Sequence, residues 1–175
     1  MDPSETGKDC MVLVLMGPMG SGKTTIGKML AEKLGWPFYD GDRFHPKENV
    51  EKMRAGIALT DEDRRLWLEE LRDNIRRWLE ERQNTILACS ALKKAYREIL
   101  GVDQETVRTV YLKGSYALLR KRIEERQHPY MNKSLLRSQL DTLEEPEGGL
   151  RVDISATPER IVRTIIQDLK LNPSS

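Results

Sequence analysis

An α/β domain, built on a five-stranded parallel sheet flanked by helices, is the fold that this sequence predicts. Short β-rich runs alternate along the chain with longer stretches of helical period, as in strands joined by right-handed helical crossovers. Several of these runs are apolar on both faces, as strands covered on both sides of a sheet must be. A length of 175 residues is most simply one domain. We expect a single domain over residues 11–171, after a disordered tail over residues 1–10.

The strands are predicted from their apolar and β-branched composition. They cover residues 11–16, 37–40, 85–90, 107–112 and 150–154. The first helix is predicted from an apolar stripe spaced i, i+3, i+4 and i+8, formed by Ile26, Met29, Leu30 and Leu34. Gly35 suits the C-cap of that helix.

A long helix is predicted to begin after Thr60, which resembles a capping-box residue paired with Asp63. Its apolar face is formed by Trp67, Leu71, Ile75 and Leu79. We interpret Trp67 and Trp78 as packing residues rather than ligand platforms. Later helices are expected over residues 92–100, 115–127, 133–143 and 158–170.

A glycine-rich loop, "GPMGSGKT" at residues 17–24, lies between the first strand and the first helix and matches G-x-x-x-x-G-K-[ST]. Its backbone N–H groups and the helix dipole can both face phosphate oxygens. Lys23 can reach the β- and γ-phosphates, and the hydroxyl of Thr24 can ligate Mg²⁺. The loop therefore predicts binding of a nucleoside triphosphate. The residues expected to bind it are Gly17, Met19, Gly20, Ser21, Gly22, Lys23, Thr24 and Thr25.

Two carboxylates follow the second predicted strand, in "YDGDRFHP". Asp40 and Asp42 flank a glycine where a parallel sheet opens its ligand crevice. In an extended segment both point the same way, so one can orient metal-bound water while the other meets an acceptor hydroxyl. A polar loop closed by an Asx-turn is the alternative. The third strand ends in Ser90 without an acid and no N-K-x-D string is present, so motor ATPases and GTPases are disfavoured.

Arg122 and Arg126 lie at i and i+4 on one face of a predicted helix. A solvated face interleaved with glutamates would explain them. Phosphoryl transfer also needs cations at the charge that spreads in the transition state, and a mobile lid can supply them. We expect this lid over residues 122–134.

The overall composition excludes several function classes. The net charge is +1, with 29 basic and 28 acidic side chains, so no global field attracts nucleic acid or a membrane surface. No apolar stretch approaches the roughly 18 residues of a transmembrane helix. The polar, acidic N-terminus is unlike a secretory signal, which predicts a cytoplasmic protein.

With these features in place, the chain resembles the gluconokinases, a small shikimate-kinase-like family within the nucleoside-monophosphate-kinase fold. The resemblance extends over about residues 11–170. Its specific strings are "YDGDRFHPKENVEKMRAGIALTDEDRRLWL", "CSALKKAYREIL", "YLKGSYALLRKRIEERQH" and "LLRSQLDTLEEP". It implies a P-loop kinase that uses ATP and Mg²⁺ to phosphorylate D-gluconate on its C6 hydroxyl, and it suggests a homodimer.

The resemblance also implies roles for residues around the sugar acid. Asp42 would take the proton of the attacking hydroxyl, and Asp40 would support the metal through water. Lys93 and Arg64 would be available to the substrate carboxylate. The remaining substrate-pocket residues would be Ser90, Gln139 and His128, together with His45. For His45, structuring the turn before Pro46 is the alternative role.

On the nucleotide side, the resemblance implies that Arg122 stacks on the adenine and that Arg126 closes over the phosphates. Thr157 and Pro158, in "SATPER", match a loop that holds adenine edges in related kinases. The chain departs from the family pattern in "HPYM", where Pro129 follows the lid histidine, and in "SQL", where Phe is common in place of Leu140.

The strand end "CSALK" replaces the triple-glycine substrate loop of shikimate kinases, which favours a linear acid over a cyclic one. Two alternatives stay open at this stage. The chain could phosphorylate another small hydroxy acid or sugar acid, or it could be a nucleotide-binding regulatory module without transfer activity.

Overall fold

The computed structural model describes residues 10–126 and 133–173, and these form one five-stranded sheet in which every strand is parallel to its neighbours. The strand order is β2-β3-β1-β4-β5. The strands are β1 (Val12–Met16), β2 (Phe38–Asp40), β3 (Thr85–Ala88), β4 (Val107–Lys113) and β5 (Leu150–Asp153). The predicted α/β class and all five predicted strands are confirmed.

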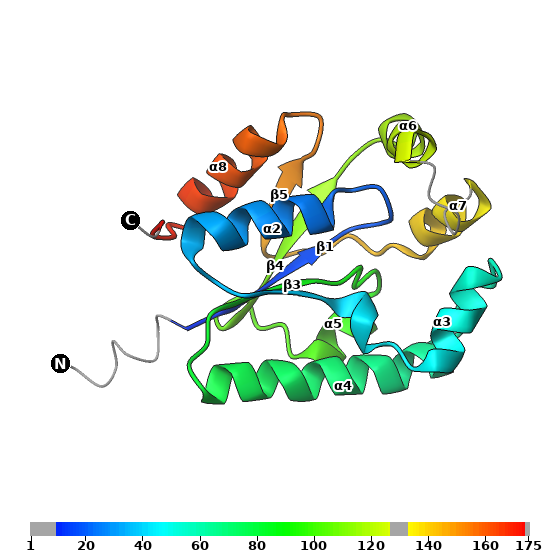
Figure 1. Ribbon diagram of the computed structural model, residues 1–175, viewed down its shortest axis with the longest axis horizontal. Helices are drawn as coiled ribbons and strands as arrows, with labels where there is room; N and C mark the ends of the chain where they lie inside the picture. The colour runs from blue at the N-terminus through cyan, green and yellow to red at the C-terminus, as the bar shows by residue number, and fades with distance from the viewer. Residues whose placement is uncertain (1–9, 127–132, 174–175) are drawn as a thin grey trace.

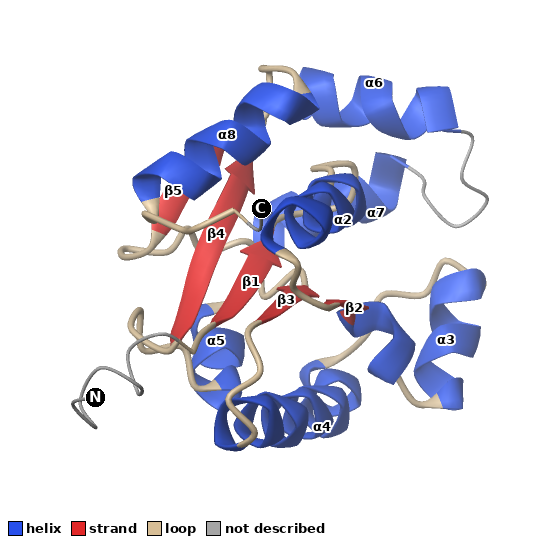
Figure 2. Ribbon diagram, turned by 60° about the vertical axis from the view of Figure 1, so that its left-hand side comes forward, coloured by secondary structure: helices blue, strands red, loops and turns tan. Residues whose placement is uncertain are grey.

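Helices cover both faces of the sheet (Figure 1). On one face lie α2 (Lys23–Leu34) and α8 (Pro158–Asp168), and on the other lie α4 (Asp61–Glu80) and α5 (Lys94–Leu100). Beyond the carboxyl ends of the strands stand α3 (Lys47–Arg54), α6 (Tyr116–Arg126) and α7 (Lys133–Thr142) (Figure 2). No helix in the described ranges is long and apolar enough to cross a membrane.

The core is divided by the sheet into two clusters, because each strand alternates its side chains between the two faces. Leu13 and Leu15 of β1 pack with residues of α2 and α8. Val14 of the same strand packs in the other cluster with Trp67 and Trp78 of α4. Both tryptophans are buried and pack in this cluster, as predicted, and Trp67 also borders a cavity at the carboxyl ends of the strands.

Local signals at helix ends are confirmed as well. The Thr60 hydroxyl accepts the Asp63 backbone N–H and the Asp63 carboxylate accepts the Thr60 N–H, which is a complete capping box. Gly35 has a left-handed conformation, and its N–H donates to Ala31 O at the end of α2.

The segment after β2 differs from the sequence-based expectation. Residues 41–44 form a 3₁₀ turn, η1 (Gly41–Phe44), rather than an extended segment. The helix α3, which the sequence analysis did not identify, follows directly. Its single buried residue is Asn49, so α3 carries no apolar stripe that periodicity could detect.

Gly41 holds this segment against the sheet. A Cβ atom built there would lie 2.6 Å from the carbonyl oxygen of Ala88, the last residue of β3. Only a residue without a side chain allows the chain to pass this close to the neighbouring strand. The positions of Asp40, which ends β2, and of Asp42, which follows it, therefore depend on this contact.

Replacing Gly41 with alanine should move the η1 turn away from β3 and lower the free energy of unfolding by about 1–3 kcal/mol, as other overpacked sites do. Urea unfolding measures this change. Gly148→Ala is the matched control, because its Cβ would meet only the flexible Gln104 side chain, at 3.4 Å. Equal stability of Gly41→Ala and the control would contradict the packing argument.

Candidate functional site

The glycine loop between β1 and α2 has the backbone conformation of a phosphate cradle. Gly17, Gly20 and Gly22 have φ angles of 148°, 82° and 94°, which glycine adopts readily. Gly22 is the N-cap of α2 and provides no side-chain cap, so the first N–H groups of that helix stay available to an anion. The Ser21 hydroxyl is buried and has no hydrogen-bond partner among the described residues. These features fit the oxygens of a bound phosphate.

Lys23 begins α2 and folds back over the loop. Its Nζ atom donates to the carbonyl oxygens of Gly17 (2.8 Å) and Pro18 (3.1 Å). Burial lowers the pKa of the Lys23 ammonium, while the nearby carboxylates of Asp42 and Asp40 act in the opposite direction. A phosphate bound in the loop would supply further negative charge to this cation.

A cavity of about 340 Å³ opens beside the loop at the carboxyl ends of β1, β2 and β3. It brings three of the expected nucleotide-binding residues together with most of those expected to bind substrate and metal. The nucleotide-binding residues are Met19, Lys23 and Thr24, of which Thr24 was also expected to bind the metal, and the others are Asp40, Asp42, His45, Arg64, Ser90 and Gln139. Gln139 reaches it from α7, and its side-chain oxygen accepts the N–H of Met19 at 2.7 Å.

Asp40 and Asp42 do face the same cavity, but not for the reason expected. The premise that both lie in an extended segment was wrong. Asp40 ends β2, and its Oδ1 atom accepts the N–H of Asp42 at 3.0 Å, which starts the η1 turn. Asp40 therefore both closes an Asx-type turn and lines the cavity, so the two alternatives occur together.

Asp42 is the carboxylate best placed to accept a proton. The surrounding protein raises the pKa of its carboxyl group, the Asp40 charge raises it further, and Lys23 opposes both. Water still reaches the group, since 72% of the side chain is exposed. A carboxylate with a raised pKa at the mouth of a cavity suits general-base work.

His45 lies behind Asp42. Its ring stacks on Trp67 with centroids 4.0 Å apart, and only 3% of its side chain is exposed. Burial, followed by the charge of Arg64, lowers the pKa of His45 to about 4, so the ring is neutral at pH 7. Its backbone N–H also caps the η1 turn on Asp42 O. His45 thus structures the turn and lines the cavity at the same time.

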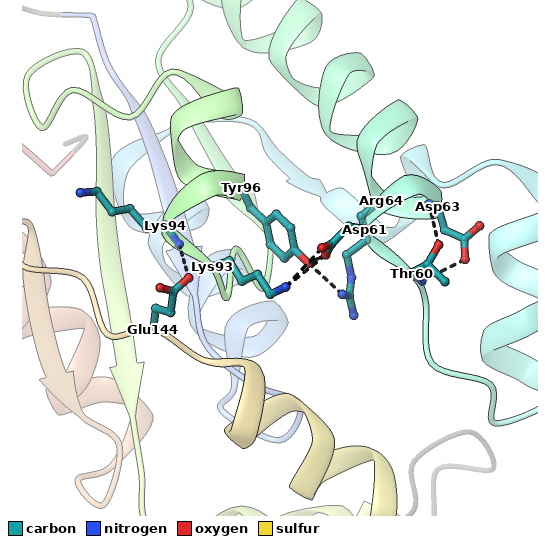
Figure 3. Close-up of polar contacts among 8 residues, drawn as sticks. All are labelled: Thr60, Asp61, Asp63, Arg64, Lys93, Lys94, Tyr96 and Glu144. Carbon is teal, nitrogen blue, oxygen red and sulfur yellow. Dashed lines mark hydrogen bonds and ion pairs between the residues drawn. The ribbon is translucent and has the colours of Figure 1, made fainter.

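Arg64 and Lys93, expected near the substrate carboxylate, belong to one polar network (Figure 3). The Tyr96 hydroxyl accepts from Arg64 at 2.9 Å and donates to Asp61 at 2.6 Å, and Lys93 pairs with Asp61 at 3.2 Å. Arg64 lines the cavity, whereas Lys93 is the N-cap residue of α5 and is not among the residues that line the cavity. Tyr96 and Asp61 join the two cations. Both lie within the strings that carry the family resemblance, but neither was singled out as a site residue.

A second cavity, of about 250 Å³, lies on the other side of the loop. Its lining includes six residues that were expected on the nucleotide or lid side, namely Ser21, Gly22, Thr25, Arg122, Arg126 and Pro158. Arg122 donates to the carbonyl oxygen of Ile154 at 2.7 Å, which fixes its guanidinium at the end of β5. Thr157 is the N-cap of α8, where its side chain accepts from Arg160. His128 lies outside the described residues.

The large cavity has a wall that the sequence analysis missed. It comes from α3, the segment after it and α7, and includes Val50, Met53, Arg54, Ile57, Leu135 and Ser138. Ile57 is an apolar side chain that is 54% exposed. No periodic signal marked these residues, because they line an open wall rather than a packed core.

The oxygen ligands in this cavity suit a Mg²⁺ ion that is held mainly by phosphate and water. No group of three His, Cys, Asp or Glu side chains that could hold a metal occurs in residues 10–126 and 133–173. Mg²⁺ in nucleotide sites keeps several waters and takes one or two protein oxygens. Thr24, exposed at the cavity, and Asp40 can supply oxygens of this kind.

Comparison with known proteins agrees with this geometry. Residues 19–170 match the family model described as shikimate kinase. A gluconokinase from Arabidopsis thaliana is 42% identical over 186 residues, covering 96% of each chain. Among solved structures, a gluconokinase from Sinorhizobium meliloti 1021 is 38% identical over 93% of each chain, with a TM-score of 0.82. A sugar kinase from Janibacter sp. HTCC2649 is also 38% identical, covering 94% of this chain and 96% of that one, with a TM-score of 0.85.

The neutral state of His45 makes stability depend on pH. Folding lowers the pKa of His45 from 6.5 to about 4. As the pH falls, His45 is therefore protonated in the unfolded chain before it is protonated in the folded protein. The contribution to stability is complete above pH 6.5 and is lost as the pH falls toward 4. Wild type should therefore lose up to about 3 kcal/mol relative to His45→Gln across this window. Urea unfolding at several pH values tests this, and a constant difference between the two proteins would contradict it.

Proposed function

This chain belongs to the gluconokinase family, within the group that the shikimate kinase model describes, and we propose that it transfers the γ-phosphoryl group of ATP to the C6 hydroxyl of D-gluconate. One observation carries the proposal. The loop lysine, the carboxylates Asp40 and Asp42, and most of the residues expected to hold a sugar acid surround a single cavity. A phosphate donor and an acceptor hydroxyl can thus meet in one place.

Each reacting group has a residue to act on it. As the C6 oxygen bonds to the γ-phosphorus, its proton passes to Asp42, the bond to the β–γ bridging oxygen breaks, and ADP leaves with that electron pair. Lys23 stabilises the negative charge that spreads over the phosphoryl oxygens. When bound, Mg²⁺ neutralises phosphate charge, and Thr24 would hold it directly while Asp40 would hold it through water.

Recognition of the sugar acid falls to the polar groups of the large cavity. The planar guanidinium of Arg64 can bind the carboxylate through two hydrogen bonds, and its contact with the Tyr96 hydroxyl orients it. Lys93 adds a second positive charge near the same end of the site. Ser90 and Gln139 offer hydrogen bonds to hydroxyl groups along the chain of the substrate.

Further parts of the proposal extend beyond this cavity. We assign a lid to residues 122–134, with Arg126 and His128 closing over the phosphates and Arg122 stacking on adenine. A homodimer in the cytoplasm, without a nucleic acid or membrane partner, completes the proposal. Size-exclusion chromatography with light scattering measures the oligomeric state.

A coupled assay of ADP release tests the activity itself. Gluconate should accelerate ADP release from ATP strongly, whereas shikimate and other aldonates at equal concentration should do so less. Equal ADP release with and without gluconate would overturn the proposed function. Faster release with another acid would overturn the choice of substrate.

Asp42→Asn should lower kcat by roughly 10²–10⁴, because the amide cannot accept the proton. Asp40→Asn should instead raise the Mg²⁺ concentration that is required, since its oxygen can still accept the N–H of residue 42. Steady-state kinetics over a Mg²⁺ titration separate the two variants. If excess Mg²⁺ rescued Asp42→Asn but had no effect on Asp40→Asn, the two roles would be reversed.

Arg126→Ala should act mainly on kcat, and Arg122→Ala mainly on the KM for ATP, because we assign Arg126 to the transferring phosphate and Arg122 to the adenine. The expected loss for Arg126 is on the order of 10²-fold, as for other transition-state donors. Arg120→Ala is the matched control, since this arginine of the same helix pairs only with exposed Glu124 in the described contacts. A change confined to the KM for ATP in Arg126→Ala would refute its assignment.

A further inference from the structure

Asn49 is a buried polar residue with no role in the chemistry described so far. It is the only buried residue of α3, and 3% of it is exposed. Its side-chain nitrogen donates to the backbone carbonyl oxygen of Asp63 at 2.8 Å and lies 3.2 Å from Nδ1 of His45. Asn49 therefore connects the start of α4 with the histidine behind Asp42.

These two contacts determine which nitrogen of His45 carries the proton. A carbonyl oxygen can only accept, so the group facing Asp63 O must be the NH₂ of Asn49. The second hydrogen of the same NH₂ then meets Nδ1, which must offer a lone pair. A neutral imidazole with a lone pair on Nδ1 has its hydrogen on Nε2.

The Nε2 atom lies on the Asp42 side of the ring. It is 3.8 Å from Asp42 Oδ1, beyond the length of a hydrogen bond in the ligand-free protein. Catalytic hydrogen bonds are often long before substrate binds and shorten in the complex. The ring has little freedom to turn, because it stacks on Trp67, whose indole N–H donates to Gly41 O at 2.8 Å.

We infer that Asn49 is a positioning residue that holds His45 as an Nε2–H donor toward Asp42, so that the carboxylate stays oriented for the attacking hydroxyl. The groups that face the ring are consistent with this assignment. Asp42 comes from η1, Asn49 from α3, and Trp67 and Arg64 from α4. With its hydrogen on Nε2 and its lone pair occupied by Asn49, the ring cannot compete with Asp42 for the substrate proton.

This inference rests on the proposed function for its kinetic consequence, but the proton position can be measured independently of activity. In protein labelled with ¹⁵N-histidine, Nδ1 of His45 should have a pyridine-like shift and Nε2 a pyrrole-like shift. The signal is assigned by its loss in His45→Phe, because the chain has only 2 histidines. A pyrrole-like Nδ1 in the wild-type protein would overturn the inference, whatever the substrate is.

Asn49→Asp provides the second measurement, because a carboxylate accepts from Nδ1–H instead of donating to it. The Nδ1 shift should become pyrrole-like, and kcat should fall between about 10-fold and 100-fold, the loss typical of a misplaced reacting group. The KM values for gluconate and ATP should change little. Placed in a His45→Phe background, Asn49→Asp should lower kcat less than twofold further, since its partner is gone.

Lys52→Met is the matched control. Lys52 and Asn49 both fasten α3 to Asp63, but Lys52 pairs with the carboxylate at 2.8 Å and does not contact His45. This variant should lower the melting temperature while the His45 shifts and kcat stay as in wild type. If Lys52→Met reduced kcat as much as Asn49→Asp, or if Asn49→Asp reduced kcat equally with and without His45, Asn49 would serve only to hold α3 in place, and the inference would be wrong.

Discussion

The parallel pairing of β1 with both of its neighbours is the constraint on which the site depends. Every residue of β1 is fully buried, and its register aligns Leu15 with Ala88 of β3 and Met16 with Tyr111 of β4. Because all strands run the same way, their carboxyl ends lie along one edge. The glycine loop therefore begins beside the end of β3, where the N–H of Gly17 donates to Ser90 O at 3.3 Å. A slip of one residue would exchange the side chains of β1 between the two buried clusters, so the packing of each cluster, rather than an alternation of apolar and polar residues, holds this register.

Charged groups whose charged form is disfavoured by the surrounding protein lie at the same edge of the sheet. Burial lowers the pKa of Lys23, and the surrounding protein together with the Asp40 charge raises the pKa of Asp42, although most of the Asp42 side chain is exposed. The attraction between the two charges opposes these shifts. Functional sites commonly retain such costs because the charged groups act on a bound ligand. Here the expected ligand brings phosphate to Lys23 and a hydroxyl to Asp42.

The helix α3, which forms a wall of the large cavity, is held in place by polar contacts rather than by apolar packing. The helices α2, α4 and α8 are held through apolar faces, whereas α3 is fastened to α4 by Asn49 and Lys52, which both contact Asp63. An element held by a few directional contacts has a precise orientation but buries little apolar surface. It stands beside the end of β2, next to the η1 turn that carries Asp42 (Figure 2). His45 contacts both Asp42 and Asn49, so it connects the η1 turn with α3.

By itself, the sequence determined the α/β class, the five strands, the capping box at Thr60 and the phosphate loop, because these depend on local periodicity and on residue types at fixed spacing. The tertiary structure alone decided how Asp40 and Asp42 face the cavity, that Tyr96 and Asp61 join Arg64 to Lys93, and that α3 forms a wall. The last two features come from polar contacts between residues far apart in the chain, such as Asn49 with Asp63 and Arg64 with Tyr96. The two carboxylates are oriented by the turn at Asp40 and by the close approach of Gly41 to Ala88. A periodic pattern records which side chains avoid water. It does not record which distant donor and acceptor meet, since that follows only from the packing of the elements that carry them.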